Sequence, residues 1–167
     1  MTSNSAKRTR KTWKNRITGL LIWCCPVIAA YLCSVFVVQA AVVQDHSMSP
    51  ALHDKQLVIL NKWDHTYGQG DVIAFSCEDL KCLLVKRIVG VPGDEILIRD
   101  GRVWRNGEIL EEYFSVRDET EKYFLVPEDC YFVLGDNYED SVDSRDSRVG
   151  FVKKEMITGK VFFFGNN

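Results

Sequence analysis

The feature that most constrains this chain is a long uncharged stretch near its N-terminus. From Ile17 to Val43 no side chain carries a charge, and these 27 residues are rich in Leu, Ile, Val, Phe, Trp and Ala. A helix needs about 20 predominantly apolar residues to span the hydrocarbon core of a bilayer. The sequence therefore predicts one transmembrane helix over 17–43, with any compact domain built from the residues that follow.

The charges that flank this stretch predict its orientation. Residues 1–16 contain six Lys and Arg side chains and no acid, so the positive-inside rule predicts a basic cytoplasmic N-terminus over 1–16 and an extracytoplasmic domain over 44–167. The alternative is a cleaved secretory signal, for which Gln39-Ala40-Ala41-Val42 offers a weak cleavage site. Because the stretch is longer than a typical signal core, we favour a retained single-pass anchor.

The charge of the remaining chain excludes one class of partner. Residues 45–167 hold 15 basic and 23 acidic side chains, a net charge of −8. A nucleic-acid groove needs clustered Lys and Arg in excess, so we expect no nucleic-acid partner. This part of the chain, about 120 residues, is long enough to bury a single hydrophobic core.

Two of the six cysteines are spaced for a bridge. Cys77 and Cys82 bracket four residues between two apolar runs, so a hairpin could bring them within bridging distance in an oxidising compartment. We expect a disulfide there and a buried thiol at Cys130. A C-x4-C spacing without a second Cys or His pair is a poor zinc signature, and we expect neither a metal site nor a cofactor.

Short apolar runs separated by Gly- and Pro-containing turns dominate the chain after Pro50. Because no long amphipathic helical pattern lies between them, the runs predict a mainly β domain, an antiparallel β-barrel or sheet, rather than a parallel α/β sheet. Residues 95–126 read as a small inserted hairpin region, and 153–157 as a helical turn. The expected strands are 56–61, 71–76, 82–89, 95–99, 102–105, 123–126 and 131–134.

Ser47 and Lys86 are the most informative pair of side chains. A serine hydroxyl is a weak nucleophile until a base takes its proton, and a lysine can act as that base only where apolar surroundings favour its neutral form. Strand alternation places Lys86 on one face with Leu84 and Ile88, which favours a depressed pKa. Taken singly, each residue has a commoner role, Ser47 as a helix cap and Lys86 as a snorkelling or exposed strand lysine.

Two further polar features accompany this pair. His46 is a rival base, but adjacent side chains rarely point at each other, so it is poorly aimed at Ser47. The polar loop 135–145 has the composition of a calcium loop, yet it lacks the sixth-position glycine and the flanking helices of an EF-hand. The commonest structure for such a loop is a solvated turn rich in Asp and Asn, and we expect no calcium there.

Three blocks of this sequence, in this order, resemble the type I signal peptidases, which are membrane-anchored serine proteases with a Ser-Lys dyad. The blocks are Ser47-Met48-Ser49-Pro50, then Val85-Lys86-Arg87-Ile88-Val89-Gly90-Val91-Pro92-Gly93-Asp94, then Gly135-Asp136-Asn137 with Ser141-Val142-Asp143-Ser144-Arg145. The second block is highly specific. The resemblance covers nearly the whole chain after the predicted anchor, and it implies the signal-peptidase type of β fold.

The resemblance also implies a role for individual residues. Ser47 would attack the scissile carbonyl, and neutral Lys86 would take the hydroxyl proton and later return one to the leaving amine. Ser141 would hydrogen-bond Lys86, while Asp143 and Arg145 would form an ion pair that orients the loop.

The chain departs from the family beside the nucleophile. The resemblance implies that the oxyanion binds the backbone N–H of Ser47, with Met48 as the supporting residue of the same motif. Many relatives carry a side-chain hydroxyl two residues before the nucleophile, where this chain has Asp45. A carboxylate there would repel a developing oxyanion if it pointed inward. Either Asp45 turns away, or the chain is a member with altered kinetics and substrate preference.

The activity implied by the resemblance is that of signal peptidase I in the inner membrane. Such an enzyme cleaves signal peptides from exported preproteins at small-x-small sites, and the expected partners are preproteins or prepilins and membrane lipid. One alternative is a specialised peptidase that matures pilin or conjugative-transfer proteins, because the insert is short and the pair Asp45-His46 is unusual. An alternative of another class is an inactive anchored domain that only binds exported chains.

Overall fold

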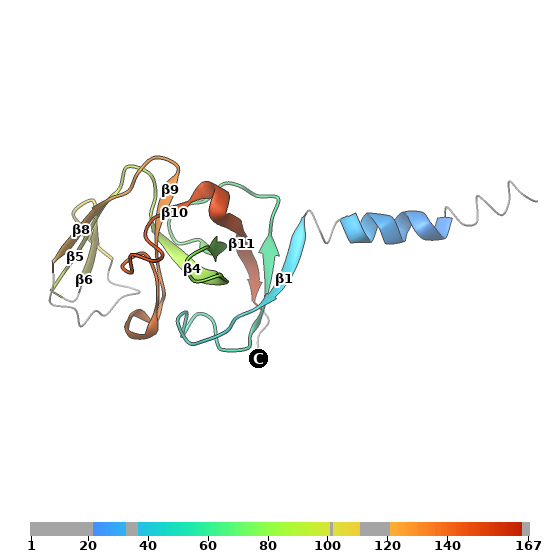
Figure 1. Cartoon of the computed structure of the whole chain (residues 1–167), viewed down its shortest axis with the longest axis horizontal. Coiled ribbons are helices and arrows are strands. Elements are labelled where there is room, and N and C mark those ends of the chain that lie inside the picture. The colour runs from blue at the N-terminus through green and yellow to red at the C-terminus, as the bar shows by residue number, and fades with distance from the viewer. Residues whose placement is uncertain (1–21, 33–36, 101, 111–120, 165–167) are drawn as a thin grey trace, which may run out of the picture. The chain divides into compact units, whose positions relative to one another are not determined.

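The computed structural model describes residues 22–32, 37–100, 102–110 and 121–164. The chain divides into two units, Met1–Val37 and Val38–Asn167. The described part of the first unit contains a helix over residues 22–32 (Figure 1). Within the described ranges, no helix is both long enough and apolar enough to cross a membrane. The predicted basic segment 1–16, and residues 17–21 and 33–36 of the predicted span, lie outside these ranges.

The C-terminal end of the predicted transmembrane helix is wrong, because Val38–Val42 form strand β1. This strand pairs antiparallel with β2, Leu57–Asn61. The next residue, Val43, belongs to a buried hydrophobic cluster of the β unit. Small and β-branched apolar residues fit a pleated sheet, but hydropathy scores them in the same way when they continue a membrane helix. The β unit therefore begins at Val38 rather than at residue 44.

Seven strands form the larger antiparallel sheet, in the order β1-β2-β11-β3-β4-β9-β10. The C-terminal strand β11 thus inserts between β2 and β3, and β4, which carries Lys86, lies between β3 and β9. The strands not yet located are β3 (Val72–Cys77), β4 (Cys82–Gly90), β9 (Cys130–Leu134), β10 (Val152–Lys153) and β11 (Ile157–Phe164). A segment of the chain that follows β9 contains the short 3-10 helix η1, Tyr138–Asp140.

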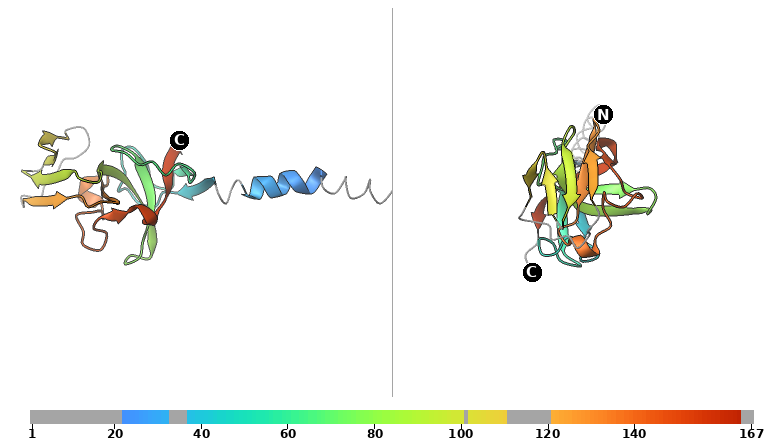
Figure 2. Two further views of the ribbon diagram at one scale, coloured as in Figure 1. Left: turned by 90° about the horizontal axis from the view of Figure 1, so that it is seen from above. Right: turned by 90° about the vertical axis from the view of Figure 1, so that its left-hand side faces the viewer.

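The segment between β4 and β9 forms a second antiparallel sheet of four strands, in the order β7-β6-β5-β8. Its strands are β5 (Glu95–Arg99), β6 (Arg102–Arg105), β7 (Glu108–Ile109) and β8 (Lys122–Leu125). The views in Figures 1 and 2 place this sheet at the end of the β unit away from β1. Ile96, Ile98 and Val103 on its inner face pack with Phe132 of β9 in one buried cluster, which ties the second sheet to the first.

The prediction of a mainly antiparallel β domain is confirmed. The sequence left a barrel and a sheet as alternatives, and the described strands form sheets. The end strands of the larger sheet, β1 and β10, are not neighbours in its order, so the closed barrel is wrong. Closure depends on the stagger and tilt of strands far apart in sequence, which residue alternation does not reveal. The helical turn predicted over 153–157 is confirmed as the 3-10 helix η2, Lys154–Met156.

The predicted disulfide is not formed, because Cys77 and Cys82 are both free thiols. The two residues do face each other across the β3–β4 hairpin as a register pair. The buried Cys77 Sγ, however, donates a hydrogen bond to the Arg148 carbonyl oxygen at 3.4 Å, while Cys82 is exposed. The hairpin therefore satisfies the spacing, yet the Cys77 Sγ bonds to Arg148 and forms no bridge with Cys82.

Candidate active site

Ser47 lies in a tight turn between β1 and β2, and its backbone is held on both sides. The neighbouring side chain of Met48 is fully buried in a hydrophobic cluster with Leu52 and residues of β2 and β3. The Ser47 carbonyl oxygen accepts a hydrogen bond from the Asn137 N–H at 2.9 Å. The Ser47 N–H donates to the Asp45 Oδ1 at 2.8 Å. Burial of Met48 and the contact with Asn137 therefore fix the position from which the Ser47 hydroxyl projects.

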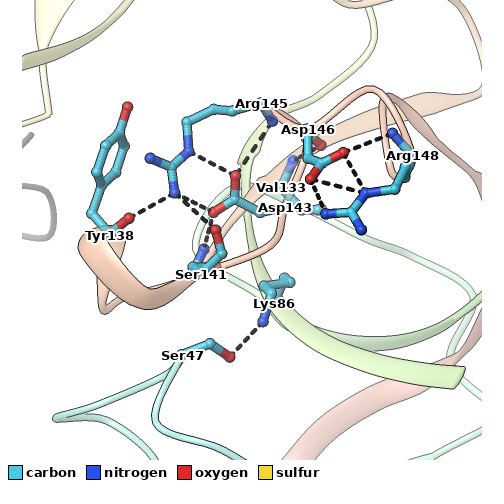
Figure 3. Close-up of polar contacts among 11 residues, drawn as sticks. Ser47, Lys86, Val133, Tyr138, Ser141, Asp143, Arg145, Asp146 and Arg148 are labelled. Carbon is cyan, nitrogen blue, oxygen red and sulfur yellow. Dashed lines mark hydrogen bonds and ion pairs between the residues drawn. The ribbon is translucent and has the colours of Figure 1, made fainter. Parts of the chain in front are cut away.

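Lys86 presents its side-chain nitrogen to this hydroxyl from strand β4. Its side chain is 2% exposed, and its Nζ donates a hydrogen bond to the Ser47 Oγ at 2.5 Å (Figure 3). Burial lowers the pKa of Lys86, although the nearby carboxylates of Asp45, Asp143 and Asp136 partly oppose that effect. Desolvation disfavours the charged form of a lysine, so the site favours a neutral amine beside a serine hydroxyl. His46, the rival base, is exposed.

A cleft of about 230 Å³ opens beside the two side chains. One wall consists of residues 41–45 together with Ser47, and the other consists of residues 82–86 of β4. Residues 41–42 of β1 and residues 82–86 of β4 are extended and carry backbone donors and acceptors. An extended peptide can therefore lie along the cleft, with a carbonyl carbon placed against the Ser47 Oγ.

The loop after β9 is held by one buried ion pair. The carboxylate of Asp143, which is fully buried, accepts hydrogen bonds from the Arg145 guanidinium at 2.7 and 2.8 Å and from the Gly135 N–H at 3.1 Å. Arg145 also donates to the Tyr138 carbonyl oxygen at 2.8 Å and lies over the Tyr138 ring. Figure 3 shows this network beside Lys86. The pair therefore fixes the loop that flanks Ser47 and Lys86.

Ser141 does not make the hydrogen bond that the resemblance implies. Its Oγ is buried, and among the described residues it has no hydrogen-bond partner. The side chain lies against Gly135, close to the carbonyl oxygen of Ser47, since a Cβ atom built on Gly135 would meet both. Ser141 is therefore near Ser47, but this structure does not pair it with Lys86.

Sequence reasoning assigned no role to three features of the site: the ion pair between Arg87 and Asp136, the missing side chain at Gly135, and the backbone N–H of Asn137. Arg87 donates to both oxygens of Asp136 at 2.8 and 2.6 Å, which joins the strand of Lys86 to the loop of Asn137. Gly135 provides the space that Ser47 and Ser141 occupy. Arg87 lies in the second motif block and Asp136 in the third, and their opposite charges were a signal that could have predicted this ion pair. The backbone contact of Asn137 and the steric role of Gly135 leave no such signal.

Comparison with known proteins identifies the family. A model of the family described as "Signal peptidase, peptidase S26" matches residues 16–165. The signal peptidase I T of Bacillus subtilis (strain 168) is 31% identical over 100% of this chain and 97% of its own length. The chain belongs to the signal peptidase family, S26.

Other members of the S26 signal peptidases are similarly related. The signal peptidase I of Bacillus amyloliquefaciens is 31% identical over 96% of both chains. A crystal structure of a signal peptidase I from Enterococcus faecalis V583 is 31% identical and matches 58% of this chain and 97% of its own, with a TM-score of 0.49. As a member of the S26 family, this chain is a peptidase and therefore a hydrolase.

Proposed function

We propose that this S26 peptidase is a membrane-anchored signal peptidase I that removes signal peptides from exported preproteins with a Ser47–Lys86 dyad. The observation that carries the proposal is the 2.5 Å contact between the Ser47 Oγ and the Lys86 Nζ in a buried position. A nucleophile within hydrogen-bond reach of a base with a lowered pKa is the arrangement that activates serine for acyl transfer.

The first half of the reaction forms an acyl-enzyme. The Ser47 Oγ attacks the scissile carbonyl carbon while its proton passes to the neutral Lys86 Nζ. The carbonyl oxygen becomes an oxyanion, and the backbone N–H of Ser47 donates a hydrogen bond to it. When the carbon–nitrogen bond breaks, the Lys86 ammonium returns the proton to the leaving amine.

The second half releases the signal peptide. A water molecule gives a proton to Lys86 and attacks the acyl carbon, and the bond to the Ser47 Oγ breaks. The proton on Lys86 then returns to the Ser47 oxygen, so that both side chains recover their starting states. The Asp143–Arg145 pair takes no part in bond making. It holds the loop that packs beside the dyad.

Two features support a substrate that lies in the same membrane. Residues 17–37 are uncharged and long enough to span a bilayer even without β1, and the six basic residues before them favour a cytoplasmic N-terminus. Confinement of enzyme and preprotein to one bilayer plane raises their encounter rate and supplies part of their orientation. The cleft beside Ser47 has a volume of only about 230 Å³, which favours small residues, such as Ala, at the first and third positions before the cleaved bond.

The test is cleavage of a preprotein with an Ala-x-Ala site by the full chain in detergent. Ser47→Ala and Lys86→Ala are each expected to abolish cleavage, whereas Ser147→Ala and Lys153→Ala, at exposed positions, retain it. Cleavage that survives Lys86→Ala would reject the dyad and point to His46. A prepilin assayed in parallel separates the two substrate classes, since a specialised peptidase would cleave the prepilin and spare the general preprotein.

A further inference from the structure

The Asp45 side chain accepts the hydrogen bond of the Ser47 N–H, the donor that the proposed reaction requires. Its Oδ1 lies 2.8 Å from the Ser47 nitrogen and accepts that residue's N–H. Both residues line the cleft that also contains Lys86. A carboxylate oxygen and the oxyanion of a tetrahedral intermediate are both negatively charged acceptors, so the two groups compete for one backbone N–H.

We infer that Asp45 is a built-in occupant of the oxyanion site, and that the substrate carbonyl must displace its carboxylate from the Ser47 N–H before acylation. This inference rests on the proposed function. It makes Asp45 a positioning residue that sets how readily the site accepts a reacting carbonyl.

The structure allows the carboxylate to leave without disturbing the turn. Asp45 is exposed, so the displaced side chain can enter water. Its backbone is held independently, because the Asp45 N–H donates to Asp54 Oδ1 at 3.0 Å and Val43 exchanges two backbone hydrogen bonds with Lys55 and Gln56. Rotation of the side chain therefore breaks the contact with Ser47 and leaves these bonds in place.

Displacement of Asp45 also acts on the base. Four groups near Lys86 raise its pKa against the effect of burial, namely Asp45, Asp143, Asp136 and Cys82, and Asp45 is the strongest of them. When its charge moves away from the cleft, the neutral form of Lys86 is favoured. A bound substrate thus gains an oxyanion donor and a more available base in the same movement, because one carboxylate opposes both.

A purely structural role for Asp45 is the competing explanation. A side-chain oxygen that accepts the N–H two residues later is a common turn-stabilising contact. The two roles predict opposite results when the carboxylate is removed. If the contact only shapes the turn, its loss weakens every function of the site, whereas an occupant of the oxyanion position restrains one step and its loss accelerates that step.

The test compares Asp45→Gly with Asp45→Asn in the full chain. Glycine suits the backbone φ of 96° at this position and removes the acceptor. Asparagine keeps an acceptor oxygen of the same shape and removes the charge. The measurements are kcat/KM against pH on a preprotein, and the affinities of an Ala-x-Ala peptide aldehyde and of the matching peptide amide. The aldehyde forms a hemiacetal whose oxygen needs the Ser47 N–H, and the amide does not.

Asp45→Gly is expected to bind the aldehyde about tenfold more tightly, with unchanged affinity for the amide, and to raise kcat/KM by about the same factor. Both variants should move the acid limb of the pH profile to lower pH, because neutral Lys86 then persists at lower pH. Aldehyde affinity that stays the same or falls in a folded Asp45→Gly variant would overturn the inference. If Asp45→Gly does not fold, the Asp45→Asn variant provides the test. The inference is overturned if Asp45→Asn leaves both the acid limb of the pH profile and the aldehyde affinity unchanged.

Cleavage by the wild-type protein distinguishes a failure of the proposed function from a failure of the inference about Asp45. A wild type that does not cleave the preprotein overturns the proposed function, and the inference with it. An active wild type whose activity is lost in Ser47→Ala, combined with Asp45 variants that show neither change, overturns the inference alone.

Discussion

Gly135→Ala tests whether the position of the nucleophile depends on a space that only glycine leaves open. A Cβ atom at residue 135 would lie 2.5 Å from the Ser47 carbonyl oxygen and 2.6 Å from the Ser141 Cβ. Ordinary contact begins near 3.4 Å, so the Ser47 carbonyl would have to retreat by about 0.9 Å. The Ser141 Oγ would lie closer still, and rotation of that side chain could relieve its contact. The Ser47 carbonyl oxygen is a backbone atom, so no side-chain rotation can relieve the clash with it.

The expected cost falls on catalysis more than on folding. A misplacement of about 1 Å can lower the rate by about 100-fold, so kcat/KM for preprotein cleavage should fall by about that factor. Overpacking of a dense site costs about 1–3 kcal/mol, so the Tm should fall moderately and the sheets should persist by circular dichroism. The shift of Ser47 would also weaken the 2.9 Å hydrogen bond from Asn137.

Gly68→Ala is the matched control, since a Cβ atom there would meet only the Asp71 Oδ2, at 3.9 Å. This variant should keep wild-type kcat/KM and Tm. Wild-type activity in Gly135→Ala would refute the reasoning, because it would show that the turn of Ser47 moves without loss of function. Equal losses in both glycine variants would refute it as well.

Two predictions concern buried ionisable groups. Lys86→Met should abolish cleavage and stabilise the fold at neutral pH, because the buried side chain no longer has to lose a proton and its hydration on folding. Because folding lowers the Lys86 pKa, the unfolded chain binds more protons between that lowered pKa and about 10.4, so wild-type stability should rise with pH across this window. Urea unfolding should show no such rise in the variant, and a less stable variant would contradict the argument. Asp143→Ala should destabilise by about 3–5 kcal/mol by leaving Arg145 unpaired, whereas Asp146→Ala, which breaks the more exposed pair with Arg148, should leave the Tm unchanged, and equal effects would contradict the burial argument.

Most of the β domain could be predicted because its strands are short apolar runs bounded by turn residues. The expected strands 95–99 and 102–105 coincide with β5 and β6. The expected strands do not include β1, β7, β10 or β11. In β11 the residues Thr158, Gly159 and Lys160 interrupt the apolar pattern. β1 is an uncharged continuation of the apolar stretch, while β7 and β10 are only two residues long. Such short strands exist because a neighbouring strand pairs with them, and a local pattern of two residues carries no periodicity.

The candidate site was predictable where it depends on the chemistry of single side chains. Alternation in β4 predicts that Lys86 shares a face with apolar residues, and the structure buries it there beside Ser47. The hydrogen bond implied for Ser141 is not formed. Whether such a bond forms depends on the conformation of the loop held by Asp143 and Arg145. No sequence pattern specifies a loop conformation to the accuracy of a hydrogen bond.

The sequence by itself determined that this chain has an uncharged stretch, a β domain with alternating apolar strands, and a serine and a lysine whose chemistry suits acyl transfer. These properties follow from local composition and periodicity, which act through neighbouring residues. Only the tertiary structure decided where β1 begins, that the Cys77 Sγ bonds to Arg148 rather than to Cys82, and that the Asp45 carboxylate accepts the Ser47 N–H. Each of these depends on distances of a few ångströms between groups whose directions are set by packing and hydrogen bonding across the whole domain.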